Sequence, residues 1–276
     1  MSAIESTKIK KFGTMAGVFT PTFLTILGVI MYIRLPWVVG NAGIIGAFLI
    51  ILVAVAITIT TALSLSSITT NIRIGSGGAF SLISQSLGLE IGGAIGIPFF
   101  FSQAIAVAMY IFGFREGLQS ILPEYSPLLL DLLIFTLVMA IAFISTSFAF
   151  KIQYVIMAII ILSIFSIVGG LFITDLNYEF TWLGDYAGSK ENNFGGSSFW
   201  LVFAVFFPAV TGVMAGANMS GDLKNPRKSI PNGTLSAVVI TTFVYLGLVI
   251  VAALLAKPKE LVSDYNIFIE KAYFAP

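Results

Sequence analysis

The sequence contains neither cysteine nor histidine among its 276 residues. These absences exclude disulfide bonds, thiol catalysis, and zinc or acid–base sites built on imidazole. Charged residues are also scarce, at 10% of the chain, and the net charge is only +1. The chain therefore lacks the basic excess of a nucleic-acid-binding protein, and it offers no nucleophile–base set for hydrolysis. We expect no enzymatic activity, no cofactor and no nucleic-acid partner.

Apolar residues dominate what remains, at 58% of the chain with a mean hydropathy of +1.01. This composition is typical of an integral membrane protein, whose spans need about 20 apolar residues each. The polar residues 1–13 indicate a cytoplasmic tail, because no short apolar region with a cleavage site follows them. Seven apolar segments are long enough to span, at residues 14–38, 43–66, 91–114, 126–149, 152–174, 198–220 and 233–256.

The distribution of charge predicts the orientation, because lysine and arginine concentrate in cytoplasmic loops. A cytoplasmic N-terminus places these basic residues inside: Lys8, Lys10, Lys11, Arg73, Lys151, Lys224, Arg227 and Lys228. It places these acidic residues outside: Glu124, Asp175, Glu179, Asp185 and Glu191. We therefore predict a protein of the plasma or cell membrane with its N-terminus in the cytoplasm.

The first apolar segment contains residues that disfavour a regular helix, in the stretch TPTFLTILGVI at 20–30. Pro21 has no amide hydrogen to donate, and Gly28 tolerates unwound backbone. The hydroxyls of Thr22 and Thr25 can bond to the carbonyls that such a break frees. Unpaired backbone groups at this depth survive only inside the protein or along a wet cavity. We therefore predict a break near 24–29 that forms a binding site.

The sixth apolar segment repeats this pattern in FFPAVTGVMAG, residues 206–216, which holds Pro208, Thr211, Gly212 and Gly216. Interrupted first helices in two halves are typical of inverted-repeat transporters, whose substrates bind at the midplane. Freed carbonyls and a threonine hydroxyl suit a dehydrated alkali cation. The amides at 28–30 and 212–214 suit a small anion or a carboxylate.

Four stretches resemble the cation–chloride cotransporter family of the amino acid–polyamine–organocation superfamily. They are LTILGVIMYIRLPWVVGNAG, GGAFSLISQSLGLEIGGAIG, AVAMYIFGFRE and FFPAVTGVMAGANMSGDLKNPRKSIPNGT. The resemblance covers residues 17–256 and implies an all-α, inverted-repeat secondary transporter with helices 1 and 6 broken. It makes residues 14–256 transmembrane helices 1–7 and residues 257–276 an extracellular segment leading to a missing helix 8. We therefore expect a fragment, truncated after helix 7.

The resemblance implies a symporter that couples chloride to potassium by alternating access, and it leaves sodium co-transport open. The implied potassium ligands are the Ile26 and Pro208 carbonyls, the Tyr110 and Thr211 hydroxyls, and Thr25, where the family has asparagine. The implied chloride sites are the amides of Gly28, Val29 and Ile30 and those of Gly212, Val213 and Met214. The implied extracellular gate is the ion pair between Arg34 and Glu116.

Two other functions stay open at this point. An amino acid or amine permease of the same fold would use the same amides to hold a substrate carboxylate. A non-transporting membrane subunit would have lost its second half. The expected partners are the lipid bilayer and the transported inorganic ions, with a homodimer through the missing C-terminal part as an open alternative.

Overall fold

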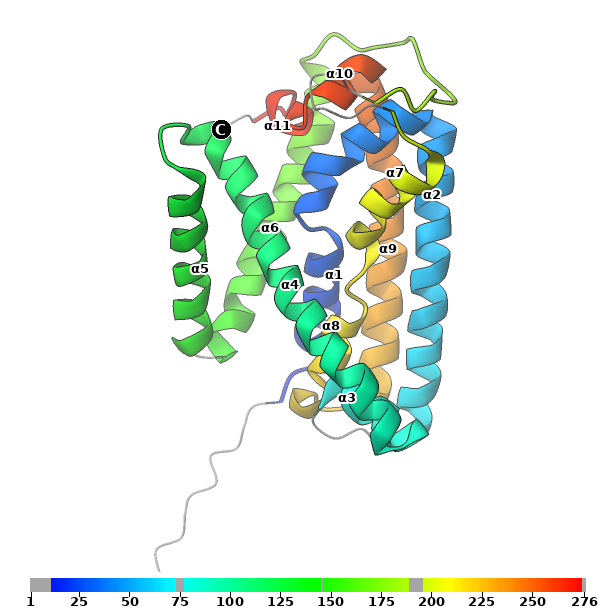
Figure 1. Cartoon of the computed structure of the whole chain (residues 1–276), viewed down its shortest axis with the longest axis vertical. Helices are drawn as coiled ribbons and strands as arrows, with labels where there is room; N and C mark the ends of the chain where they lie inside the picture. Colours follow the sequence, from blue (N-terminus) through cyan, green and yellow to red (C-terminus); the bar gives the residue numbers. More distant parts are fainter. Residues whose placement is uncertain (1–10, 73–76, 145, 189–195, 275–276) are drawn as a thin grey trace, which may run out of the picture.

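The computed structural model describes residues 11–72, 77–144, 146–188 and 196–274, and these residues form a helical bundle without a β-sheet (Figure 1). Residues 1–10 of the predicted tail, Arg73 and Glu191 lie outside the described residues. The elements are η1 (Met15–Phe19), α1 (Thr20–Ile26), α2 (Val29–Asn71), α3 (Gly78–Leu87), α4 (Leu89–Ile121), α5 (Pro127–Ile144), α6 (Thr146–Gly169), η2 (Gly170–Phe172), α7 (Phe199–Phe206), η3 (Phe207–Val210), α8 (Met214–Asn218), η4 (Ser220–Asp222), α9 (Pro226–Leu255), α10 (Pro258–Ser263) and α11 (Ile267–Glu270).

The first predicted break is confirmed, and it falls at residues 27 and 28. The turn before Pro21 widens into the π-helix η1, as expected where proline removes a helical hydrogen bond. Helix α1 then ends at Ile26, because Leu27 turns to φ −84° and ψ 50°. Gly28 is extended, and the chain resumes a helix at Val29. The break therefore separates η1 with α1 from the helix that opens α2; after the orientation predicted from the sequence, we name these the inner and the outer half-helix.

The second predicted break is also confirmed. Helix α7 ends at Phe206, and Pro208 lies in the following 3₁₀ turn, η3. Thr211 is extended, at φ −77° and ψ 166°. Gly212 has a φ of 116°, a conformation that costs glycine little and other residues considerably more. Helix α8 begins two residues later, at Met214, so the unwound stretch is 211–213.

The boundary predicted between the first two spans, at 39–42, lies one residue further along the chain, at Gly43, whose non-helical backbone separates two helices that share the label α2. The helix bends at Gly43, whose φ is 70°, and the amides of Ile44 and Ile45 bond to the carbonyls of Thr181 and Trp182 at 3.0 and 2.9 Å. These contacts satisfy the amides that the bend frees, so no loop is needed. At 1.5 Å per residue the 43 residues would extend about 65 Å, roughly twice the hydrocarbon thickness of a membrane. Helix α2 therefore holds two crossings.

Five stretches in the described residues are long and apolar enough to cross a membrane: Met15–Asn71, Leu89–Gln119, Lys151–Phe172, Phe199–Asn218 and Pro226–Leu255. The apolar helix Pro127–Phe143 is shorter than these. Because the first stretch contains two crossings, the helices follow the order of the seven apolar segments predicted from the sequence.

Helices α2 and α9 run side by side along one side of the bundle (Figure 1). Half of the most apolar stretch of α9 is buried, against 6% of that of α4. Helices α4, α5 and α6 lie to one side, and their apolar side chains, such as Phe100 and Phe143, point outward. The broken helices thus contact α2 and α9 on one side and α4 on the other.

Backbone contacts close the end of the bundle at which α9 begins. The Phe12 amide bonds to the Asp222 carbonyl at 2.8 Å, and the Lys224 amide bonds to the Phe12 carbonyl at 2.9 Å. Just beyond this bridge, Gly216 lies so close to Val18 that a Cβ on it would be 2.3 Å from the valine methyl. The inner half of the first helix therefore packs tightly against α8, and no wide passage separates them.

Candidate functional site

The two breaks lie directly against each other. A Cβ built on Gly212 would be only 2.5 Å from Cγ2 of Thr25, so the unwound backbone of one helix touches the last turn of the other. Helix α4 covers the junction, because a Cβ on Gly28 would be 3.2 Å from the Tyr110 ring. One turn further along α4, Gly113 makes room for the side chain of Val29. The fold thus brings together three segments that the sequence predicted as parts of one site.

The residues predicted to bind the cation are found around this junction, where they bond to one another. The Tyr110 hydroxyl donates to the Thr25 carbonyl at 3.3 Å, and the Thr211 hydroxyl donates to the Pro208 carbonyl at 2.7 Å. Thr211 is exposed, and Thr25, Tyr110 and Pro208 are partly exposed, whereas Ile26 is buried. Each hydroxyl oxygen keeps lone pairs that could face a cation. The arrangement is therefore rich in oxygen and open to solvent on one side.

Two polar residues at the breaks were not predicted from the sequence. Tyr245 on α9 donates its hydroxyl to the Ile26 carbonyl at 2.7 Å and lies 3.2 Å from the Ala209 carbonyl. Thr58 on α2 donates to the Val210 carbonyl at 3.2 Å. A tyrosine in an apolar helix needs a partner for its hydroxyl. The family resemblance singled out Tyr110, whereas this argument, applied to the apolar helix α9, would have indicated Tyr245.

The predicted anion-binding amides lie at the starts of two helices of very different length. Gly28, Val29 and Ile30 open α2, where the first amides of a helix have no intrahelical acceptor. Gly212, Val213 and Met214 open α8, which has five residues. Positive potential near a helix start comes mainly from its first turn. The α2 start is thus the more regular of the two groups.

The predicted gate residues form a loose, accessible ion pair. Nη2 of Arg34 lies 3.8 Å from Oε2 of Glu116, and the two side chains are 33% and 39% exposed. The Arg34 guanidinium also stands 4.4 Å from the centre of the Tyr265 ring. Exposed pairs of this kind contribute about 0–1 kcal/mol, so the contact can open at little cost.

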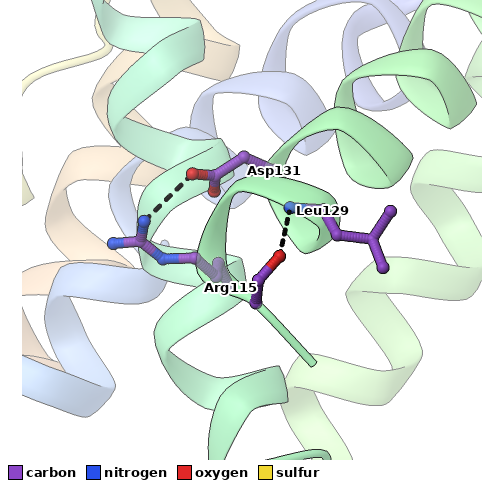
Figure 2. A network of polar contacts seen from close by, with 4 residues as sticks. Arg115, Leu129 and Asp131 are labelled. Carbon is purple, nitrogen blue, oxygen red and sulfur yellow. Dashed lines mark hydrogen bonds and ion pairs between the residues drawn. The ribbon is translucent and has the colours of Figure 1, made fainter. Parts of the chain in front are cut away.

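A second, closer ion pair lies at the same end of α4, on a neighbouring face. Nη1 of Arg115 is 3.0 Å from Oδ2 of Asp131, which joins α4 to α5 (Figure 2). The amide of Leu129 bonds to the Ser126 hydroxyl at 3.4 Å, which helps to fix the start of α5 beside it. Because Arg115 and Glu116 are consecutive, the outer end of α4 is tied to α5 on one face and to α2 on the other.

Comparison with known proteins gives the family. The family model described as amino acid permease matches residues 17–271. Solute carrier family 12 member 2 of Homo sapiens is 42% identical over 261 residues, which are 89% of this chain and 22% of that protein. The same member from Squalus acanthias is 42% identical over 87% of this chain and 21% of its own length. Solute carrier family 12 member 1 of Mus musculus is 39% identical over 90% of this chain and 24% of its own length.

The matches cover most of this chain, but the chain spans only about a fifth of the length of these relatives. The family match extends over both broken helices and over α4. The chain belongs to the amino acid permease family, and the resemblance to its cation–chloride cotransporters is confirmed by close relatedness to solute carrier family 12.

Proposed function

We propose that the protein is a secondary active symporter that couples chloride to potassium by alternating access. The observation that carries the proposal is the contact between the two breaks, where Gly212 lies against Thr25 beneath Tyr110. Carbonyl and hydroxyl oxygens gather on one side of this junction, and helix-start amides lie on the other. Relatedness to solute carrier family 12 supports the same function.

The cation would be held by oxygen atoms from three segments. The proposed ligands are the Ile26 and Pro208 carbonyls, the Tyr110 and Thr211 hydroxyls, and an oxygen of Thr25. A ring of such dipoles replaces the hydration shell of a potassium ion without needing a carboxylate. The hydroxyls could keep donating to the carbonyls that they now contact, because each hydroxyl oxygen has lone pairs left to face the ion.

Chloride would bind to the amides of Gly28, Val29 and Ile30, at the N-terminal end of the outer half-helix. The amides at 212–214 are the proposed place of a second chloride. A cation at the carbonyl ends and an anion at the amide ends would each lower the cost of burying the other, because opposite charges attract strongly at low dielectric. This mutual stabilisation would couple the two ions.

Alternating access would use the two ends of the bundle differently. At the outer end the exposed pair of Arg34 and Glu116 is the proposed gate. At the other end the bridge at Phe12 would have to part before an ion could leave. We place the outer end outside the plasma membrane and the N-terminus in the cytoplasm, as the basic loops predict.

An amino acid or amine permease is the second candidate, and the family model itself favours it. Thr25 stands where the cotransporters are expected to have asparagine, and a carboxylate substrate would fit the same amides as chloride. Competition by amino acids in the absence of any chloride requirement would identify this function.

Rubidium uptake into liposomes tests the proposal. The protein would be the longest natural reading frame containing this chain, and uptake would be measured with chloride and again with gluconate in its place. We expect uptake to collapse without chloride, because the cation would then lack its partner charge. Uptake that is indifferent to chloride would overturn the proposal, and so would amino acid uptake in its place.

Two variants locate the cation site in the same assay. Thr211→Ala and Tyr110→Phe each remove one proposed ligand, and we expect both to raise the rubidium concentration for half-maximal uptake. Thr60→Ala is the matched control for the threonine, because its hydroxyl bonds only within α2 on an exposed face. Unchanged rubidium activation in both site variants would show that the cation binds elsewhere.

A further inference from the structure

Tyr245 is the one side chain in the described residues that bonds to a carbonyl at each of the two breaks. Its hydroxyl oxygen is 2.7 Å from the Ile26 carbonyl oxygen and 3.2 Å from that of Ala209. Ile26 ends α1, and Ala209 lies in η3 just before the unwound stretch. The three residues are 0%, 2% and 2% exposed, so water does not reach this contact.

The chemistry of the contact is unusual because a phenol has one proton and faces two acceptors. The shorter distance assigns the proton mainly to Ile26, with Ala209 within reach of the same proton. Both carbonyls belong to C-terminal ends of helical segments, which carry partial negative charge. Without a donor between them, these ends would repel each other and lose a buried hydrogen bond.

The hydroxyl is held in place by the packing of its ring. Phe206 lies edge-on to Tyr245 with ring centres 5.3 Å apart, and Leu248, one turn further along α9, is buried in the same core. Because the Tyr245 hydroxyl contacts a carbonyl at each break, a shift of the ring toward one break would change both contacts. The donor is therefore fixed, and the two carbonyls are positioned relative to it.

We propose that Tyr245 is a positioning residue of the cation site. Its hydroxyl occupies one lone-pair direction of the Ile26 carbonyl and directs the other toward the cation, and its second contact holds the break in the sixth helix at a matching distance. The inference rests on the proposed function, in which Ile26 supplies a cation ligand. It adds that Tyr245 on α9 sets the distance between the two breaks and therefore the size of cation that the site selects.

The consequence is a change in cation affinity with little change in the maximal rate. Tyr245→Phe keeps the ring and its packing and removes only the hydroxyl. One lost hydrogen bond corresponds to a roughly 3- to 10-fold rise in the rubidium concentration for half-maximal uptake. At saturating rubidium and chloride the rate should stay within about twofold, because the ions still bind once their concentration is high enough. We also expect weaker discrimination between rubidium and the smaller lithium ion.

The experiment is rubidium uptake by the longest natural reading frame containing this chain, with rubidium varied at saturating chloride. Tyr32→Phe is the matched control: it also removes one phenol hydroxyl, and that hydroxyl bonds to Ser163 of α6 and to no carbonyl at either break. Tyr245→para-aminophenylalanine, introduced by stop-codon suppression, restores a donor at the same place. We expect it to return the half-maximal concentration to within about twofold of the unmodified protein, and this variant carries the test if the Phe variant does not fold.

The outcomes separate the inference from the proposed function. If the unmodified protein shows no chloride-dependent rubidium uptake, the proposed function fails, and this inference fails with it. If it does show such uptake but Tyr245→Phe and Tyr32→Phe have the same rubidium concentration for half-maximal uptake, only the inference is overturned. A fall in the maximal rate with unchanged half-maximal concentration also contradicts it, since that result indicates a general loss of folded protein. If the aminophenylalanine variant needs as high a rubidium concentration for half-maximal uptake as the Phe variant, the hydrogen-bond donor does not have the proposed role.

Discussion

Replacing Gly212 by alanine is the sharpest test of the contact between the breaks. The new Cβ would lie 2.5 Å from Cγ2 and 2.8 Å from Cβ of Thr25, where ordinary contacts begin at 3.4 Å. The two unwound segments would have to separate by about 1 Å to accept it. Alanine would also have to adopt a φ of 116°, which only glycine takes up readily.

The magnitude follows from these two effects. Overpacking of a close contact costs about 1–3 kcal/mol, and a backbone conformation disfavoured by a side chain costs about 1–3 kcal/mol. We expect Gly212→Ala to lower the free energy of unfolding by about 2–6 kcal/mol and to abolish most rubidium uptake. Thr25→Ser removes the methyl group nearest to the new Cβ while keeping the hydroxyl that bonds to Pro21. Added to Gly212→Ala, it should recover some of the packing loss, because the 2.5 Å contact disappears while the 2.8 Å contact with Cβ stays, and it should leave the backbone cost unchanged.

The assay is thermal unfolding in detergent, followed by the fluorescence of the three tryptophans, alongside uptake in liposomes. Gly247→Ala on α9 is the matched control, because no atom lies within 4 Å of its Cβ position. That change should be neutral or stabilise by up to about 1 kcal/mol, as for glycine in a helix interior. If Gly212→Ala unfolds and transports as Gly247→Ala does, the breaks do not touch as described and the reasoning fails.

Two further predictions concern the outer end. Arg115→Leu strands the mostly buried Asp131 carboxylate, so we expect a loss of about 1–3 kcal/mol in thermal unfolding, less than for a fully buried pair. Combining it with Asp131→Leu should recover most of that loss, and two losses that simply add would contradict a direct pairing. The pKa of the Glu270 carboxyl on α11 is raised, chiefly by the charge of Asp264 beside it. The folded protein therefore holds this proton more tightly than the unfolded chain, so α11 should gain stability as the pH falls below the raised pKa. Limited proteolysis at a series of pH values should show this gain, and it should vanish in Glu270→Gln.

The breaks could be predicted from the sequence because their causes are local. Pro21 removes a backbone donor, and Gly28 and Gly212 permit conformations that other residues avoid. The hydroxyls of Thr60 and Thr61 likewise bond to carbonyls of their own helix, as threonines inside a helix commonly do. Each of these features depends on residues within a few positions of one another.

The contacts that were not predicted depend on residues far apart in the chain. Tyr245 bonds to Ile26 across 219 positions, and no sequence spacing indicates that pairing. The boundary between the first two spans was predicted close to Gly43, but the bonds that the freed amides make to residues 181–182, in a distant loop, were not. Arg115 and Asp131 are separated by 16 positions and a turn, so their pairing depends on how α5 folds back on α4.

The bridge at Phe12 has a consequence for genetics. Both of its hydrogen bonds run between backbone atoms of Phe12, Asp222 and Lys224, so no exchange of one side chain for another deletes them. Proline at position 12 or 224 would remove a donor, and an inserted residue would shift the register. A screen for variants that stay open at this end should therefore recover prolines and insertions here, while most other substitutions pass unnoticed. Tolerance of substitution along this segment would then reflect a closure made of backbone hydrogen bonds, and it would not mean that the segment is dispensable.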